Sequence, residues 1–312
     1  MTTLPLVFSP EVAAARRDGQ PLVALESTII THGMPWPQNL DTARAVEAEV
    51  RASGAVPATI AVIAGKLHVG LSDAALEALA RAENVAKLSR ADFAVCLATG
   101  GTGATTVAAT MIAARLAGIE VFATGGVGGV HKGAEHSFDI SADLQELAAS
   151  PVTVVAAGAK AILDLPKTLE VLETLGVPVI AFGQDTLPAF WSRDSGLRAP
   201  LRLDSAAEIA AAHRMRAALG LPGGQLVANP VPVEDEIAPR TLAPIIARAQ
   251  NEAEAQGIAA KAVTPFLLNR IFELTEGQSL ATNIALVLNN ARLAAAIATE
   301  IAAQSRNTRQ SA

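Results

Sequence analysis

Residues 120–160, EVFATGGVGGVHKGAEHSFDISADLQELAASPVTVVAAGAK, contain the alternation on which the fold depends. A short apolar strand is expected at Glu120–Ala123, a helix at Ser141–Ala149 and a second apolar strand at Val152–Ala156. Strands that are apolar throughout and are joined by helices are typical of a parallel sheet that is covered on both faces. This stretch therefore predicts an α/β fold.

The same alternation continues toward both ends of the chain. Further strands are expected at Leu22–Glu26, Thr59–Ala64, Phe93–Ala98, Val177–Phe182 and Gln225–Ala228. Further helices are expected at Asn39–Ala52, Ser72–Ala82, Thr105–Ala117, Lys167–Leu175, Ser205–Leu219, Thr241–Gln256, Pro265–Glu276 and Ser279–Ala303. Ser205 and Glu208 form a capping box, which marks one helix start. We expect a three-layer α/β/α fold with a mostly parallel central sheet, in a single domain over residues 1–303 that is followed by a disordered tail at 304–312.

The composition is that of a globular protein with a large core. Of the 312 residues, 51% are hydrophobic and 17% are charged, which excludes a disordered chain. The formal net charge is −6 and aromatic residues make up 3%, so a nucleic-acid-binding surface is disfavoured. Cys96 is the single cysteine of the chain, which excludes an internal disulfide and a cysteine-based zinc site.

The sequence predicts neither an export signal nor a membrane partner. Its N-terminus, MTTLPLVFSPEV, lacks the basic and apolar regions of a signal peptide. Ala94–Ala114 is uncharged and long enough to cross a bilayer, but Gly100, Gly101 and Gly103 interrupt it. We interpret this segment as a buried strand, a glycine loop and a buried helix. We therefore expect a cytoplasmic protein.

Four of the expected strands run directly into polar or glycine-rich sequence. Leu22–Leu25 is followed by Glu26, and the other three are followed by TGGTG at 99–103, TGGVGGVHK at 124–132 and GAK at 158–160. Ligands of open parallel sheets bind outside the carboxyl ends of the strands. Because these ends converge on one edge of the sheet, we expect a binding site there.

The two glycine loops are candidates for holding a phosphate group. Glycines expose backbone N–H groups, and a following helix offers its N-terminus to an anion. Residues 101–106 read G-x-G-x-x-T and no P-loop motif occurs, so a nucleotide fingerprint is not present. The alternative is that the glycines only allow tight turns and close packing. Together with Thr105, Thr106 and Lys132, the loops favour a sugar phosphate or a phosphate monoester.

Lys160 and Glu26 are the candidate catalytic residues. Lys160 is the only charged residue in 147–163, so its amine is partly desolvated and can act as a nucleophile or form a Schiff base. Glu26 follows four apolar residues and suits proton donation. The alternatives are a lysine that extends to solvent and a carboxylate that caps the next loop. His32 and His131 suit either a structural hydrogen bond or a role in the site.

The segment DISAD, which begins at Asp139, allows two interpretations. Its spacing resembles the start of a calcium loop, but Leu144 and Ser150 occupy the sixth and twelfth positions and exclude an EF-hand. Asp139 alone could still hold a hydrated Mg²⁺ or Mn²⁺. From spacing we favour the alternative, in which Ser141 caps the following helix and Asp143 lies near its positive end.

The motif ALESTIITHGMP at residues 24–35 resembles the opening signature of the pseudouridine-5′-phosphate glycosidase family. The likeness continues in the same order over nearly the whole chain, at Asn39 and at residues 57–61, 88–90, 100–107, 125–131, 138–144, 157–164 and 264–268. Ala156 stands where the family has Cys, and Ala91 stands where an Arg is usual. Neither difference replaces a catalytic group of the family.

The resemblance implies an enzyme that reversibly cleaves the C–C glycosidic bond of pseudouridine 5′-phosphate to uracil and ribose 5-phosphate. It implies that Lys160 is the covalent nucleophile, Glu26 the proton donor and Asp139 the ligand of a Mn²⁺ ion in each subunit of a homotrimer. The resemblance therefore favours a functional role for Asp139, whereas spacing alone favours a helix-capping role for this segment. Substrate contacts are implied for Lys87, Thr106, Val107, His131, Ser141, Ala142, Asp143 and Asn283.

The implied chemistry accounts for a lysine in the site. Ordinary glycosidases use two carboxylates because protonation releases an oxygen leaving group. The atom that leaves from uracil is carbon C5, so its release needs an electron sink, and an imine between Lys160 and C1′ of the opened ribose supplies one. A Schiff-base aldolase or lyase for another sugar phosphate would also use Lys160. A sugar-phosphate-binding regulator would need no lysine chemistry and is disfavoured, because no DNA-binding module is present.

Overall fold

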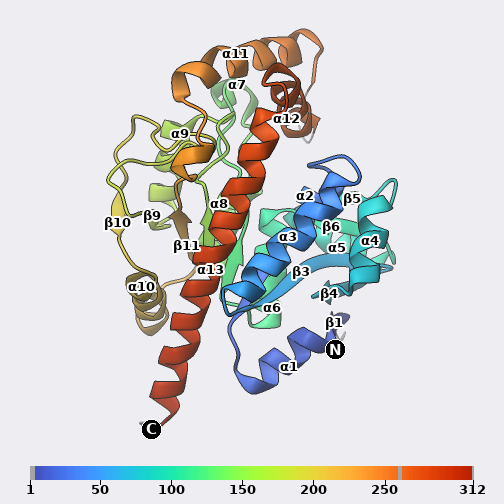
Figure 1. Cartoon of the computed structure of the whole chain (residues 1–312), viewed down its shortest axis with the longest axis vertical. Coiled ribbons are helices and arrows are strands. Elements are labelled where there is room, and N and C mark those ends of the chain that lie inside the picture. The colour runs from blue at the N-terminus through green and yellow to red at the C-terminus, as the bar shows by residue number, and fades with distance from the viewer. Residues whose placement is uncertain (1–3, 259–261, 311–312) are drawn as a thin grey trace.

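The computed structural model describes residues 4–258 and 262–310, and Figure 1 shows how its elements are arranged. Within these residues eleven strands form one sheet in the order β1-β4-β3-β2-β7-β8-β11-β9-β10, with β6 paired to β3 and β5 paired to β6. The strands are β1 (Leu6–Phe8), β2 (Leu22–Leu25), β3 (Val56–Ile63), β4 (Lys66–Val69), β5 (Ala86–Leu88), β6 (Gly103–Thr105), β7 (Val121–Ala123), β8 (Thr153–Ala156), β9 (Val179–Phe182), β10 (Leu201–Leu203) and β11 (Gln225–Ala228). Their pairings are parallel except those of β3 with β4 and β6, so the mostly parallel sheet is confirmed.

Helices connect most of the successive strands, as the alternation predicts, and only β3–β4 and β9–β10 follow each other without a helix among the described residues. The helices are α1 (Pro10–Asp18), α2 (Thr28–Thr31), α3 (Gln38–Ala52), α4 (Asp73–Arg81), α5 (Arg90–Ala98), α6 (Val107–Ala117), α7 (Ala134–Ser137), α8 (Ala142–Ala149), α9 (Leu165–Thr174), α10 (Ala206–Ala218), the 3₁₀ turn η1 (Val233–Asp235), α11 (Pro239–Ala255), α12 (Val263–Leu274) and α13 (Gln278–Gln310). Ser205 is the N-cap of α10, because its Oγ accepts a hydrogen bond from the backbone N–H of Glu208 at 3.2 Å. The other half of the expected capping box differs, because Glu208 Oε2 accepts from the backbone N–H of Asp204 at 3.0 Å and not from that of Ser205.

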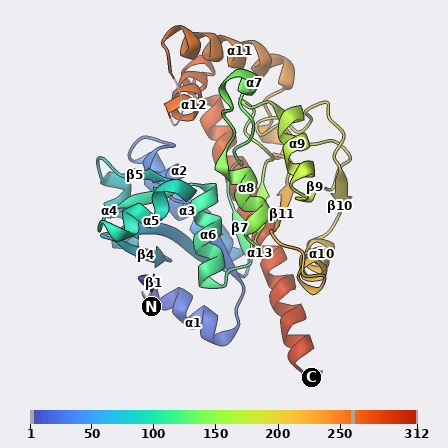
Figure 2. The same cartoon turned by 180° about the vertical axis from the view of Figure 1, so that it is seen from behind.

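The helices cover both faces of the sheet. In Figure 1, α3 and α13 lie in front of the sheet, and α13 contacts β2, β7 and β8. Figure 2 shows α6 and α8, which contact each other on the opposite face. This arrangement confirms the expected three-layer α/β/α fold.

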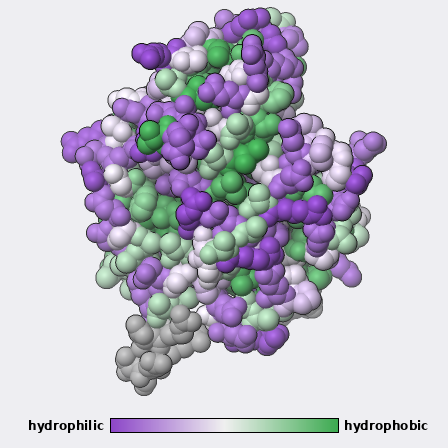
Figure 3. Space-filling model, in the orientation of Figure 1, coloured by the Kyte–Doolittle hydropathy of each residue, from purple (hydrophilic) through white to green (hydrophobic). Residues whose placement is uncertain are grey.

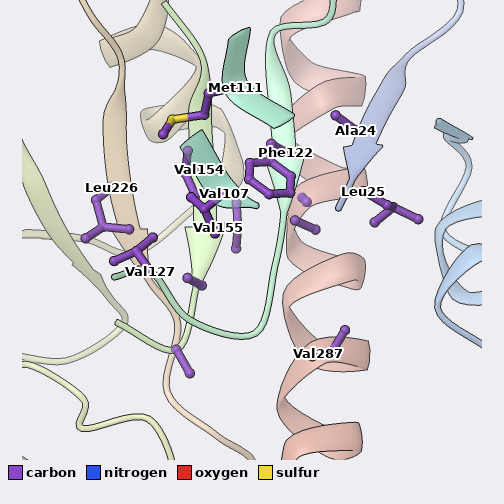
Figure 4. Packing of buried hydrophobic residues seen from close by; sticks show 14 of the residues in the cluster. Ala24, Leu25, Val107, Met111, Phe122, Val127, Val154, Val155, Leu226 and Val287 are labelled. Atoms are coloured by element: carbon purple, nitrogen blue, oxygen red, sulfur yellow. The ribbon is translucent and has the colours of Figure 1, made fainter. Parts of the chain in front are cut away.

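The core consists mainly of aliphatic side chains, because the chain has few aromatic residues. Figure 4 shows Phe122 of β7 and Val154 of β8 near Met111 of α6, and it shows Val287 on α13. The first three of these residues are fully buried, and burying a side chain of this size stabilises a fold by about 1.5–3 kcal/mol. The sheet is therefore a rigid support for the loops at its edges.

The expected strand Phe93–Ala98 is wrong, because these residues belong to helix α5. The backbone N–H of Ser89 donates to Asp92 Oδ2 at 3.0 Å, and this capping interaction begins the helix. Phe93 and Cys96 are buried, whereas Val95 between them is 62% exposed, which is the spacing of one helix face. A short apolar run does not distinguish a strand from a helix, and the cap decides the outcome here.

The expected helix Thr105–Ala117 begins later, at Val107. Thr106 is its N-cap, and Gly103–Thr105 form strand β6 instead. Thr105 lies in the sheet because its backbone N–H donates to Ser27 Oγ at 2.9 Å and its hydroxyl donates to the Ile60 carbonyl at 2.8 Å. Both partners are distant in the sequence, so local pattern could not indicate this strand.

The last helix, α13, extends past residue 304, where the sequence analysis expects a disordered tail, and is helical to Gln310. Residues 311–312 at the end of that expected tail lie outside the described residues. In its part Gln278–Gln304, α13 is long and apolar enough to cross a membrane, but 56% of its most apolar window is buried inside the protein. Figure 3 shows hydrophobic residues over the upper part of this helix and mixed polarity elsewhere on that face. The core helix of a globular protein has the same composition.

Candidate active site

A cavity of about 380 Å³ lies where the carboxyl ends of β2, β7 and β8 meet. Its wall comes from the loops after these strands, from β5, from the starts of α6 and α8, and from α12 and α13. The residues for which the resemblance implies a role all line this cavity: Glu26, Lys87, Thr106, Val107, His131, Asp139, Ser141, Ala142, Asp143, Lys160 and Asn283. Thr105 and Lys132, which the sequence analysis also links to a phosphate, are not part of its wall, because Thr105 is buried in the sheet and Lys132 donates to Gln250. The roles that the resemblance implies for them remain predictions.

The two glycine loops differ in their relation to the cavity. The second loop lines it through Gly125, Gly126 and Gly128. Among the described lining residues, the segment 99–106 contributes only Thr106. Four strand ends are expected to meet at the site, but only three do so in the described part of the chain. The fourth, before residues 99–103, is absent because Phe93–Ala98 form a helix and not a strand of the sheet.

Glu26 is held at the end of β2 by hydroxyl groups. Its carboxylate accepts hydrogen bonds from Thr28 Oγ1 at the start of α2 and from Thr124 Oγ1 in the loop after β7. The neighbouring Ser27 is fully buried and bonds to Thr105, which attaches the turn to β6. The half-buried carboxylate is consequently oriented at the cavity wall before any ligand binds.

Lys160 is positioned by a turn that requires glycine. Its backbone N–H donates to the Val127 carbonyl at 3.1 Å. Gly158 has a φ of +83°, and a Cβ there would lie 2.9 Å from the Pro188 carbonyl oxygen. Among the described residues, the half-buried Lys160 Nζ has neither an ion pair nor a hydrogen bond. Its amine is therefore available to a ligand in the cavity.

Ser141 and Asp143 have the capping role that their spacing predicts, and they also line the cavity. Ser141 is the N-cap of α8, with its Oγ accepting from the Asp143 N–H at 3.2 Å. The Asp143 carboxylate accepts backbone hydrogen bonds from Ala108 and Gly128, both at 2.8 Å. At 6% exposure, Asp143 joins α8 to the start of α6 and to the glycine loop.

The histidines of the cavity are electrostatically biased toward the neutral form. Burial lowers the pKa of His131, Asp139 opposes this shift, and the positive charges of Lys160 and Lys87 add to it. Burial likewise lowers the pKa of His32, with Lys87 again contributing. A neutral imidazole has one nitrogen that donates a hydrogen bond and one that accepts one, so both histidines suit contacts with a polar ligand.

The carboxylates of the cavity suit a divalent cation that keeps most of its water ligands. They do not suit a metal site in which protein side chains supply every ligand. Within the described residues there is no group of three or more His, Cys, Asp or Glu side chains that could hold a metal. Both Asp143 oxygens already accept backbone hydrogen bonds, whereas the Asp139 carboxylate accepts none among the described residues. One carboxylate with several waters is a coordination that Mg²⁺ and Mn²⁺ accept, so Asp139 fits such an ion.

Several residues of the site were not assigned by sequence reasoning. α12 contributes Thr264, Pro265 and Leu268 to the cavity wall, and the sequence shows them only as part of the resemblance, without a role. Asn290 of α13 is fully buried and donates through Nδ2 to the Thr124 carbonyl at 2.8 Å. This bond attaches α13 to the loop after β7. A buried asparagine in a helix carries no local signal that could have revealed this contact.

Comparison with known proteins places the chain among enzymes. Residues 11–300 match the family described as Indigoidine synthase A like protein. The chain is 77% identical over 296 residues to the pseudouridine-5′-phosphate glycosidase of Jannaschia sp. (strain CCS1), which covers 95% of this chain and 98% of the relative. It is 70% identical over 306 residues to the protein of the same name from Roseobacter denitrificans (strain ATCC 33942 / OCh 114), which covers 98% and 99%.

Two solved structures share the fold over almost their whole length. The prealnumycin C-glycosynthase AlnA in complex with ribulose 5-phosphate has a TM-score of 0.90 and 37% identity, covering 98% of this chain and 100% of that one. An indigoidine synthase A-like protein from Thermotoga maritima has a TM-score of 0.88 and 34% identity, covering 97% and 98%. The chain therefore belongs to the indigoidine synthase A-like family, in which its relatives are named pseudouridine-5′-phosphate glycosidases.

Proposed function

We propose that the protein is a pseudouridine-5′-phosphate glycosidase, which reversibly cleaves pseudouridine 5′-phosphate to uracil and ribose 5-phosphate. The observation that carries the proposal is that the Lys160 amine and the Glu26 carboxylate line one cavity at the carboxyl edge of the sheet. The names of the relatives that are 77% and 70% identical support it. The ribulose 5-phosphate of the AlnA complex supports a sugar phosphate as the ligand class.

Lys160 would supply the electron pair that stabilises C1′ as the C–C bond breaks. Its nitrogen attacks C1′ as the ribose ring opens, and O4′ leaves C1′ and takes up a proton. The bond between C1′ and uracil C5 then breaks, its electron pair stays on C5, which gains a proton, and the nitrogen lone pair forms the imine. Water hydrolyses the imine, which returns the amine and releases ribose 5-phosphate. Glu26 would move protons in these steps.

The phosphate would bind to backbone N–H groups and a nearby cation. Gly125 and Gly126 expose backbone at the cavity, whereas the Gly128 N–H already donates to Asp143, and Lys87 adds a positive charge. Losing a charge-assisted hydrogen bond costs about 1.5–3 kcal/mol, so recognition of phosphate would favour the nucleotide over the nucleoside.

Asp139 would hold a Mn²⁺ ion in each subunit, with waters and substrate oxygens as further ligands. Bound there, the ion supplies positive charge that stabilises developing negative charge on oxygen.

We further propose a cytoplasmic homotrimer. Phe138 and Ile140 flank Asp139 and are 81% and 43% exposed, which supports burial of this rim against another copy.

Incubation with uracil and ribose 5-phosphate, followed by mass analysis, tests the proposed function. The expected result is consumption of ribose 5-phosphate that depends on uracil and yields pseudouridine 5′-phosphate. Pseudouridine without the phosphate should be a poor substrate in the reverse direction. Consumption of ribose 5-phosphate that is independent of uracil would instead favour an aldolase or lyase for another sugar phosphate.

A further inference from the structure

The orientation of the Asn283 amide in the cavity wall is determined by a tryptophan. The indole Nε1 of Trp191 donates a hydrogen bond to Asn283 Oδ1 at 2.6 Å, and it also approaches the Ser279 carbonyl at 3.2 Å. An indole N–H can only donate, so the amide atom that faces it must be the oxygen. The Asn283 Nδ2 group, which has no hydrogen-bond partner among the described residues, is then the part of the amide that a ligand can use.

Trp191 is itself fixed on every side. It is fully buried, and the backbone N–H of Ile237 donates to its carbonyl at 2.9 Å. The ring of the preceding Phe190 packs edge-on against it, with centroids 5.0 Å apart. The Phe190 N–H donates to the Ala157 carbonyl at 3.0 Å, which ties the pair to the end of β8. The indole therefore cannot turn away from Asn283 without disturbing the core.

The wall beside Asn283 suits one face of a flat ring. Phe190, Leu286 and Val287 line the cavity together with Asn283. Gly126 allows this approach, because a Cβ there would lie 2.7 Å from the Phe190 ring. An apolar surface beside a fixed amide NH2 donor matches the face and the carbonyl edge of a pyrimidine-dione.

We propose that Trp191 is a positioning residue, which holds Asn283 so that its Nδ2 group donates a hydrogen bond to a carbonyl oxygen of uracil. The proposal rests on the proposed function, because it names the part of the site that recognises the base. A base with an amino group at that edge would place two donors against each other and would be rejected. Trp191 acts through Asn283 and does not touch the reacting atoms.

The Trp191→Phe variant tests this proposal because it removes the indole N–H and retains an aromatic ring. In the synthetic direction, at saturating ribose 5-phosphate, the KM for uracil should rise by roughly tenfold, as expected for one lost hydrogen bond. Trapping of ribose 5-phosphate on Lys160 by borohydride should be unchanged, because the sugar part of the site is intact. Trp36→Phe is the matched control, since Trp36 is the other tryptophan of the chain, is 42% exposed and does not line the cavity, and it should leave both measurements unchanged.

Two further variants separate positioning from general packing. Asn283→Asp keeps an acceptor for the indole but removes the donor, so its KM for uracil should rise at least as much. In an Asn283→Ala background, adding Trp191→Phe should have no further effect on this KM, because both changes remove the same contact. An unchanged KM for uracil in Trp191→Phe would overturn the proposal that Trp191 positions Asn283. So would a further rise of this KM when Trp191→Phe is added to Asn283→Ala. If the unaltered protein traps ribose 5-phosphate but makes no product with uracil, the proposed function fails together with this assignment of the wall.

Discussion

The Asp143 carboxylate accepts a hydrogen bond at 2.8 Å from the backbone N–H of Gly128, which stands fifteen residues earlier in the chain. Its other oxygen accepts from the backbone N–H of Ala108 at 2.8 Å. One buried side chain therefore links the glycine loop after β7 to the starts of α6 and α8. The glycine loop is shaped by this contact and not by its own sequence alone.

Gly128→Ala should disrupt the site while leaving the fold intact. A Cβ at this position would lie 2.2 Å from Ser141 Oγ and 2.7 Å from Asp143 Oδ2, so the loop must shift. A displacement of this kind is expected to lower kcat/KM by about a hundredfold. Gly133→Ala in the same segment is the control, because its Cβ would meet nothing within 4 Å. Its left-handed backbone costs roughly 1–2 kcal/mol of stability, and its kcat/KM should be retained. Equal activity losses in the two variants would show that the Asp143 contact is unimportant.

Lys160→Ala should abolish turnover together with the borohydride-trapped adduct of ribose 5-phosphate. Lys160→Arg should fail equally, because a guanidinium stays protonated and cannot form the imine. The measurement is the mass of the intact protein and of the peptide that carries residue 160. Lys132→Ala is the control, because Lys132 is exposed, its Nζ donates to Gln250 at 3.1 Å, and it should retain both adduct and turnover. An adduct that maps to Lys87 or Lys132 in the unaltered protein would contradict the assigned nucleophile.

Glu26→Gln should lower turnover by about 10²–10⁴-fold, the usual contribution of a positioned acid or base. The amide keeps the shape of the side chain and can still bond to Thr28 and Thr124, so the fold should be unaffected. Lys160 is trapped at the original rate only if Glu26 is not needed to open the sugar ring, so the trapping rate reports which proton Glu26 moves. Full turnover in this variant would remove Glu26 from the mechanism.

Removal of divalent metal by a chelator should abolish activity, and Mn²⁺ should restore it, because an ion held by one carboxylate exchanges readily. Asp139→Ala should raise the Mn²⁺ concentration that is needed for half-maximal activity. Glu135→Gln changes a nearby exposed carboxylate that pairs with Lys167 outside the cavity, and it should leave the metal requirement unchanged. Full activity of metal-free protein would separate Asp139 from any metal role.

The stability of the protein should decrease as the pH falls below the ordinary histidine value of 6.5. Burial and the charge of Lys87 lower the pKa of His32, so below 6.5 the unfolded chain binds a proton that the folded chain does not. The free energy of unfolding therefore decreases as the pH is lowered below 6.5. The contribution of His32 is fully present at higher pH. His32→Gln should reduce the slope, measured by urea unfolding between about pH 5 and 8. Identical slopes for both proteins would show that His32 does not carry this dependence.

Local sequence determined the parts of the fold that depend on the spacing of apolar residues and on the capping of helices. The apolar runs that end before Glu26 and Lys160 form strands β2 and β8, because their residues are buried on both faces of a parallel sheet. Lys160 could be chosen from its sequence alone, since it is the one charge in a long apolar stretch. The Ser205 cap likewise needed only residues within one helical turn.

Tertiary structure decided what depends on residues far apart in the chain. Strand β6 takes its place in the sheet through contacts with the distant residues Ser27 and Ile60. The run Phe93–Ala98 before it is a helix, which the local cap by Asp92 begins. The Asn283 amide is oriented by Trp191, which stands 92 residues away, and no local pattern contains that information. Period and capping act over a few residues, whereas the direction of a side chain in a cavity depends on whichever distant groups the completed fold places beside it.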